Sequence, residues 1–124
     1  MRVKRFVGSI LSAGVMLTTM VVSAPAASAA TAYGCGYPQV CFYKTKADWD
    51  ARRWTAAYKD ITNYNQVLGS SAAGSYAVYN SRNDDGAFLR FAIGTSHCLL
   101  PNEKMTNITN SYVETIRIYD SASC

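Results

Sequence analysis

The stretch at residues 76–91 reads YAVYNSRNDDGAFLRF and lies near the middle of the part of the chain that we expect to fold. Both ends of this stretch are rich in aromatic and branched apolar residues, which fit a pleated, half-buried surface. Between them, residues 81–86 include Asn, Asp and Gly, the residue types that favour turns and positive φ. The pattern predicts two β-strands that form a hairpin, with a loop longer than the tightest two-residue turns.

Residues 1–29 are typical of a secretory signal peptide. Residues 2–5 carry three basic side chains, residues 6–22 are apolar and uncharged, and Ala-Ser-Ala at 27–29 has the form of a cleavage site. The alternative is an uncleaved membrane anchor, because the apolar run is nearly long enough to span a bilayer. Polar and glycine residues inside the run, together with the Ala-Ser-Ala end, favour cleavage. We therefore expect a secreted, extracellular protein in which residues 30–124 form a single β-rich domain.

The mature chain is expected to carry almost no net charge. Three of the 12 basic residues lie in the signal peptide, which leaves nine basic and eight acidic residues, a net charge of +1. Binding to nucleic acid or to an anionic membrane surface depends on a basic patch. We therefore expect no nucleic-acid partner, and no membrane association after signal cleavage.

All four cysteines lie in the mature chain, at Cys35, Cys41, Cys98 and Cys124. An even number of cysteines in a short exported chain is typical of a disulfide framework. Three pairings are formally open, and we favour Cys35–Cys41 with Cys98–Cys124, because each bridge then holds one half of the chain. The alternative is a zinc site, which the lack of C-x-x-C pairs and the single histidine argue against. We predict no metal and no cofactor.

Short strand-like runs separated by turn residues occur along the rest of the chain. Strands are predicted at residues 40–43, 87–93, 96–100 and 112–119, and polar connections at 63–74 and 102–110. Leu68 is the expected buried anchor of the first connection. In the last strand, alternation places Tyr112, Ile116 and Ile118 on one face.

Residues 45–61 allow two interpretations. Helical spacing is found at Trp54, Ala57, Tyr58 and Ile61, and Thr45 followed by Asp48 resembles a helix start. The β-rich surroundings instead favour a short helical turn near residues 48–51 and a strand at 52–57, which we adopt. The chain is therefore predicted to be an all-β sandwich or barrel of short strands with one short helix. A weak similarity between its two halves would suit two Greek keys packed sheet on sheet.

Few residues offer catalytic chemistry. His97 is the only histidine of the mature chain, no serine lies in a G-x-S-x-G setting, and the cysteines are assigned to bridges. The adjacent Asp84 and Asp85 suit a turn better than a catalytic pair, and their spacing does not match an EF-hand calcium loop. We therefore predict that the protein is not an enzyme.

Six aromatic residues form either part of the core or a face that binds carbohydrate or another protein. They are Trp49, Trp54, Tyr58, Tyr64, Tyr76 and Tyr79. Because large aromatic side chains contribute most to small cores, burial is the favoured interpretation.

Four local motifs resemble those of a known family. They are C-x5-C-F-Y at residues 35–43, R-R-W-T-A at 52–56, V-Y-N-S-R-N-D-D-G-A at 78–87 and T-I-R-I at 115–118. These motifs are similar to those of small secreted actinobacterial proteins classed as a peptidase inhibitor family, typified by the streptomycete metalloproteinase inhibitor. The resemblance implies a βγ-crystallin-like Greek-key fold, an N-terminal disulfide turn formed by Cys35 and Cys41, and a role in blocking secreted peptidases, with metallopeptidases the favoured class.

The resemblance also implies where an inhibitory loop would lie. In the founding inhibitor the reactive bond follows a cysteine and precedes an apolar residue, and Cys98-Leu99 has that local form. The candidate inhibitory loop is therefore Cys98, Leu99, Leu100 and Pro101, although strand alternation would bury at least one of the two leucines. Such an inhibitor would act as a monomer. The alternative function is a non-inhibitory crystallin-like module that binds calcium or carbohydrate, or a small secreted toxin.

Overall fold

The computed structural model describes Gly14 and residues 31–124. The predicted signal peptide, residues 1–29, therefore lies outside the described residues except for Gly14. In the described part of the chain, no helix has the length and apolar character needed to cross a membrane.

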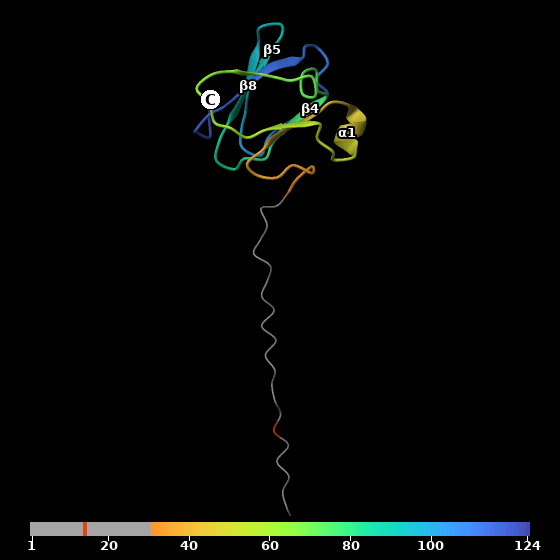
Figure 1. Cartoon of the computed structure of the whole chain (residues 1–124), viewed down its shortest axis with the longest axis vertical. Coiled ribbons are helices and arrows are strands. Elements are labelled where there is room, and N and C mark those ends of the chain that lie inside the picture. Colours follow the sequence, from red (N-terminus) through yellow and green to blue (C-terminus); the bar gives the residue numbers. More distant parts are fainter. Residues whose placement is uncertain (1–13, 15–30) are drawn as a thin grey trace, which may run out of the picture.

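Residues 31–124 form two four-stranded antiparallel sheets and one short helix (Figure 1), which confirms the all-β prediction. The first sheet has the order β2-β1-β4-β7 and contains β1 (Val40–Tyr43), β2 (Ala56–Tyr58), β4 (Ala77–Asn80) and β7 (Lys104–Met105). The second has the order β3-β8-β5-β6 and contains β3 (Gln66–Val67), β5 (Ala87–Phe91), β6 (Ser96–Leu99) and β8 (Val113–Ile118). The helix α1 (Lys46–Asp50) begins at a capping box formed by Thr45 and Asp48.

The two sheets exchange one strand each. Of the first four strands, three form the first sheet together with β7; of the last four, three form the second sheet together with β3. If four is added to each strand number, with counting resumed at β1 after β8, the order β2-β1-β4-β7 becomes β6-β5-β8-β3. This is the order of the second sheet, listed from its other edge. The two halves of the chain are therefore equivalent in topology, and neither half completes its sheet alone.

The main hydrophobic core lies between the sheets. Strand alternation turns Val40, Phe42 and Val78 of the first sheet toward the second sheet. They meet Leu89, Leu99, Ile116 and Ile118, and the predicted anchor Leu68 joins them. A smaller cluster lies on the opposite face of the first sheet. There Tyr43 and the Cys35–Cys41 disulfide pack under Tyr33 and under Trp49 of α1.

Both predicted disulfides are present. Cys35 pairs with Cys41 across 6 residues of sequence, and Cys98 pairs with Cys124 across 26. The first bridge closes the turn that leads into β1, and the second joins β6 to the C-terminus. The helix-plus-strand interpretation of residues 45–61 is also confirmed in its order, with α1 beginning two residues earlier than predicted. The strand bounds were wrong: β2 begins at Ala56, so residues 52–55, predicted as strand, belong to the connection after α1.

The hairpin predicted at residues 76–91 is wrong, because β4 and β5 do not pair. β4 pairs with β1 and β7, whereas β5 pairs with β6 and β8 in the other sheet. The linker at 81–86 crosses between the layers. Ser81 donates to the Gln39 carbonyl just before β1, and Gly86 donates to the Ser121 carbonyl just after β8. Inside the linker the buried Arg82 and Asp85 form an ion pair, so the apparent turn is a connection between sheets.

Three further differences from the predictions concern short elements. β3 and β7 are each two residues long and lie inside the segments predicted as polar connections. Tyr112 is exposed rather than inward-facing. The pairing of β5 with β8 shifts register between Arg90 and Phe91, so Val113 is the buried residue at that end of β8.

Candidate functional site

A tight turn joins β6 to β7 and displays an apolar side chain. It consists of Leu100, Pro101, Asn102 and Glu103, and we call it the 100–103 turn. The Glu103 N–H donates to the Leu100 carbonyl at 3.0 Å, and Asn102 has a φ of 60°. Proline at the second position and a positive φ at the third are features of a type II turn. At its start, the Leu100 side chain is 48% exposed.

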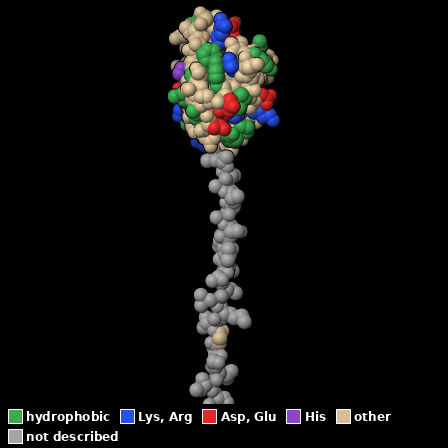
Figure 2. Space-filling view, turned by 90° about the vertical axis from the view of Figure 1, so that its left-hand side faces the viewer, with side chains coloured by type: hydrophobic (Ala, Val, Ile, Leu, Met, Phe, Trp, Pro, Cys, Tyr) green, Lys and Arg blue, Asp and Glu red, His purple; other side chains and the backbone are tan. Residues whose placement is uncertain are grey.

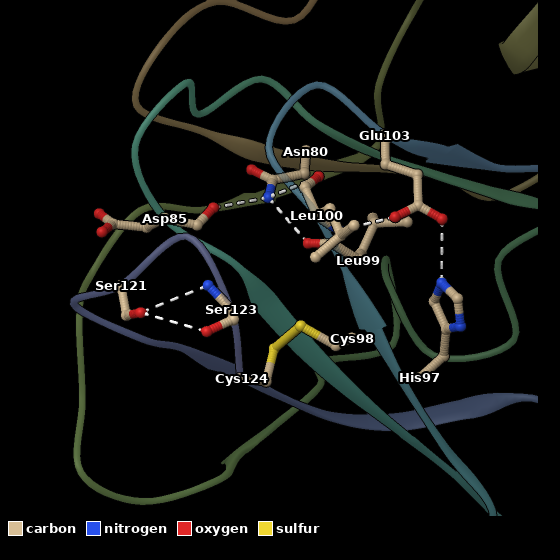
Figure 3. The surroundings of a disulfide bond; sticks show 10 residues. All are labelled: Asn80, Asp85, His97, Cys98, Leu99, Leu100, Glu103, Ser121, Ser123 and Cys124. Atoms are coloured by element: carbon tan, nitrogen blue, oxygen red, sulfur yellow. Dashed lines mark hydrogen bonds and ion pairs between the residues drawn. A yellow bond between two sulfur atoms is a disulfide. The ribbon is translucent and has the colours of Figure 1, made fainter.

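A buried amide supports this turn from inside the domain (Figure 3). Asn80, the last residue of β4, is fully buried. Its Nδ2 donates to the carbonyl oxygens of Leu99 at 3.1 Å, Leu100 at 3.3 Å and Asp85 at 2.9 Å. Its Oδ1 accepts the Arg82 N–H at 3.0 Å. This contact orients the amide so that its nitrogen, and not its oxygen, faces the turn. One side chain thus holds the backbone on both sides of the Leu100 side chain.

The Glu103 carboxylate holds the turn from its other side. Oε2 accepts the Leu100 N–H at 2.7 Å, and Oε1 lies 3.1 Å from Nε2 of His97 (Figure 3). The Asn80 N–H donates to the Glu103 carbonyl at 3.0 Å. Both backbone polar groups of Leu100 are therefore engaged within the protein while its side chain faces solvent. In the structure, the ring of His97 is a partner of the Glu103 carboxylate.

Arg82 connects the turn to two other segments. The side chain is 4% exposed, and Nη1 donates to the carbonyls of Pro38 at 2.9 Å and Lys59 at 3.2 Å. Its Nε donates to Asp85 Oδ2 at 2.9 Å, and its own carbonyl accepts the Asn102 N–H at 3.0 Å. Because Arg82 neutralises the buried Asp85 carboxylate, that carboxylate is not a free ligand for a cation.

A tyrosine–carboxylate pair lies over the same arginine. The Tyr37 hydroxyl donates to Asp84 Oδ2 at 2.7 Å, and the Arg82 guanidinium lies 5.5 Å from the centre of the Tyr37 ring. The hydroxyl stabilises the ionised carboxylate, which lowers the pKa of Asp84, and the same hydrogen bond raises the pKa of Tyr37. Both members of the pair are exposed to solvent, and Asp84 itself belongs to the linker 81–86.

The disulfide Cys98–Cys124 packs at the base of the turn. Both sulfur atoms lie against Gly86, where an added Cβ would come within 3.2 Å of each of them. This close approach explains a glycine at the end of the linker. The bridge, drawn in Figure 3, therefore joins β6 to Cys124 and packs against the end of the linker at Gly86.

The structure divides the four residues of the predicted inhibitory loop. Cys98 and Leu99 belong to β6, where Leu99 pairs with Ala87 and is fully buried in the core. Leu100 and Pro101 lie in the turn. Of the two alternatives for the leucines, alternation buries Leu99 and exposes Leu100. Of the two leucines, only Leu100 can enter a pocket of another protein without unfolding of β6.

The six aromatic residues considered from sequence divide between the core and the surface, so the burial prediction holds in part. Tyr79 is buried, and Trp49, Tyr58 and Tyr76 are partly buried against the two hydrophobic clusters. Trp54 and Tyr64 are exposed. Over the face of the described domain in Figure 2, hydrophobic, acidic and basic side chains are interspersed. In residues 31–124, no three His, Cys, Asp or Glu side chains gather as a metal site would require.

The residues that shape the turn were not identified from sequence as site residues. Asn80, Arg82 and Glu103 act through their hydrogen bonds to backbone carbonyls and N–H groups of other segments. A signal was present for Asn80: it follows Val78 at strand spacing, so alternation places its amide inward, where a polar group needs partners. No comparable signal marks Glu103, because its contacts depend on how the turn folds.

The chain matches no known protein family, no curated protein and no solved structure.

Proposed function

We propose that this protein is a secreted peptidase inhibitor that inserts Leu100 into the active-site cleft of its target. The observation that carries the proposal is an exposed leucine on a backbone that is fixed from both sides. Asn80 holds the flanking carbonyls, and Glu103 holds the Leu100 N–H. Ordering an interface costs roughly 0.5–1.5 kcal/mol for each immobilised side chain. A turn that is already held in one shape avoids part of this cost.

The chemistry of the turn favours a target with an apolar specificity pocket. The turn presents no charged side chain at Leu100 or Pro101, and Pro101 limits the flexibility of the backbone next to the leucine. The resemblance to the inhibitor family adds the peptidase class, and a leucine-preferring metallopeptidase of the thermolysin type is the favoured target. The inhibitor would act as a monomer, and it would need no cofactor or catalytic residue of its own.

We also propose that the fold is a βγ-crystallin-like pair of Greek keys. In each half, the fourth strand lies beside the first: β4 beside β1, and β8 beside β5. The third strand of each half crosses to the facing sheet. A Greek-key fold of this kind is what the sequence resemblance to the inhibitor family implies. The two disulfides are compatible with an extracellular protein, in keeping with the predicted signal peptide.

The proposal is tested by measuring inhibition constants of the protein comprising residues 30–124 against metallo-, serine and cysteine peptidases. We expect inhibition of a thermolysin-type enzyme. Leu100→Asp places a charge in an apolar pocket, and loss of a central anchor costs about 2–4 kcal/mol, or about 30- to 1000-fold in affinity. The matched control is Val67→Asp in β3, where an apolar side chain that is 81% exposed lies outside the turn. This control should inhibit as well as the wild type.

Two results would contradict the proposal in different ways. If the wild type inhibits none of the three classes at micromolar concentration, the inhibitor function is wrong, and the crystallin-like binding module becomes the better hypothesis. If the wild type inhibits and Leu100→Asp inhibits equally well, the contact lies elsewhere, with the exposed part of the linker 81–86 the next segment to test.

A further inference from the structure

The bonds around Leu100 are poorly arranged for hydrolysis. To cut the Leu99–Leu100 bond, water must attack the Leu99 carbonyl carbon while the carbonyl oxygen gains negative charge against a metal ion or hydrogen-bond donors of the peptidase. The Leu100 nitrogen must then take up a proton as the C–N bond breaks. In this protein the Leu99 oxygen faces the buried Asn80 amide, and the Leu100 N–H is directed at Glu103.

The neighbouring bonds are protected as well. The Leu100 carbonyl accepts hydrogen bonds from both Glu103 N–H and Asn80 Nδ2, so its oxygen also faces inward, and the leaving group there is the proline nitrogen of Pro101. At the Cys98–Leu99 bond, the Leu99 side chain fills the core and β6 is paired with β5. Attack at that bond would require the strand to leave the sheet.

We propose that the target peptidase binds the 100–103 turn without cutting it, and that Asn80 is the positioning residue that keeps the turn intact. This inference rests on the inhibitor function proposed above and specifies how the inhibitor acts. The turn occupies the active-site cleft uncut, and it is not a substrate that the peptidase hydrolyses slowly. Asn80 acts by directing the two carbonyl oxygens into the domain. Among residues 31–124, the Asn80 amide is the only side chain that hydrogen-bonds both oxygens, because the Glu103 N–H reaches only the Leu100 oxygen.

The test follows the protein by mass spectrometry during prolonged incubation with an equimolar thermolysin-type peptidase. Asn80→Asp keeps an acceptor for the Arg82 N–H but removes the donor hydrogens, and Asn80→Ala removes the amide altogether. Loss of these hydrogen bonds frees the Leu99 carbonyl, and we expect cleavage at Leu99–Leu100 to accelerate by about tenfold or more. The product gains the mass of one water and separates into two chains only after reduction, because Cys98–Cys124 spans the cut.

General destabilisation is controlled by a core variant with the same melting temperature as the Asn80 variants, chosen from Leu89→Ala and Ile116→Val. A merely structural role for Asn80 predicts that the control and the Asn80 variants are cut at the same sites, spread over the chain. The proposed role predicts that the first cut in the Asn80 variants falls at Leu99–Leu100, and that the control lacks this cut.

The outcomes separate the two proposals. A wild type that inhibits and remains uncut, with variants cut at Leu99–Leu100, supports both. A wild type that inhibits but is itself cut at Leu99–Leu100 or Leu100–Pro101 overturns this inference and leaves the inhibitor function standing. Variants that inhibit and remain uncut likewise overturn the role of Asn80. A wild type that does not inhibit overturns the function and this inference with it.

Discussion

Asn80 and Arg82 show how buried polar residues organise this small domain. Each is almost fully buried, and each forms hydrogen bonds with segments distant in sequence: Asn80 with the 100–103 turn, and Arg82 with Pro38 and Lys59. Leaving a buried donor or charge without its partner costs more free energy than the bond itself contributes. Substitutions that remove one member of such a group should therefore be among the most damaging in the chain.

The adjacent carboxylates Asp84 and Asp85 allow this to be tested with one matched pair. Asp85 is buried against Arg82, so Asp85→Ala removes the buried partner of this charge and leaves only the exposed Asp84 near it. We expect a loss of about 3 kcal/mol in the free energy of unfolding. Asp84 is exposed and lies 3.5 Å from the Arg82 Nε, so Asp84→Ala should cost no more than about 1 kcal/mol. Denaturant unfolding of both variants provides the comparison. Equal losses would show that the Arg82–Asp85 pair contributes no more than a surface ion pair.

Among the strands and the helix, those with a strong sequence pattern could be predicted, and those that depend on a partner could not. β1, β5, β6 and β8 each contain an apolar or alternating run, and α1 has a capping signal at Thr45 and Asp48. β3 and β7 are two residues long in polar surroundings, and only their pairing with β8 and β4 makes them strands. Two residues carry too little periodicity to predict a strand.

The hairpin error has a related cause. Turn residues between two strands show that the chain changes direction, but they do not show whether the strands pair or enter different sheets. Here the decision depends on the interior, where the linker's Arg82 and Asp85 form a buried pair between the layers. The same limit applies to the site. The sequence indicated the segment that contains Leu100, but the contacts of Asn80 and Glu103 that fix it become visible only in the folded chain.

The two disulfides should contribute unequally to stability. A bridge that closes a longer loop removes more conformational freedom from the unfolded chain. The chain-entropy relation gives about 3.5 kcal/mol for the 26-residue separation of Cys98–Cys124 and about 2 kcal/mol for the 6-residue separation of Cys35–Cys41. We therefore expect the double variant Cys98→Ser/Cys124→Ser to unfold at lower denaturant than Cys35→Ser/Cys41→Ser. The reverse order would indicate that local packing around Tyr43 outweighs loop closure.

At the scale of the whole molecule, the exchange of β3 and β7 makes the two halves dependent on each other. The first sheet lacks its edge strand β7 without the second half, and β3 has no partner without β8. The core consists of residues from both sheets, so either half alone would expose an apolar face to water. The 100–103 turn also combines both halves, since Asn80 comes from the first and Leu100 from the second. The candidate site can therefore exist only in the complete domain.

This dependence predicts a single cooperative unfolding transition for residues 30–124. Both tryptophans, Trp49 and Trp54, lie in the first half, so their fluorescence reports on that half alone. Amide hydrogen exchange in β5 and β8 reports on the second half. Because neither half retains a closed core alone, we expect the two probes to give the same denaturant midpoint, as a two-state transition requires. Fragments 30–83 and 84–124 should each lack the circular dichroism of a β-sheet when separate. Two well-separated midpoints, or a folded fragment, would mean that the exchanged strands contribute little, and that each half carries its own stable core.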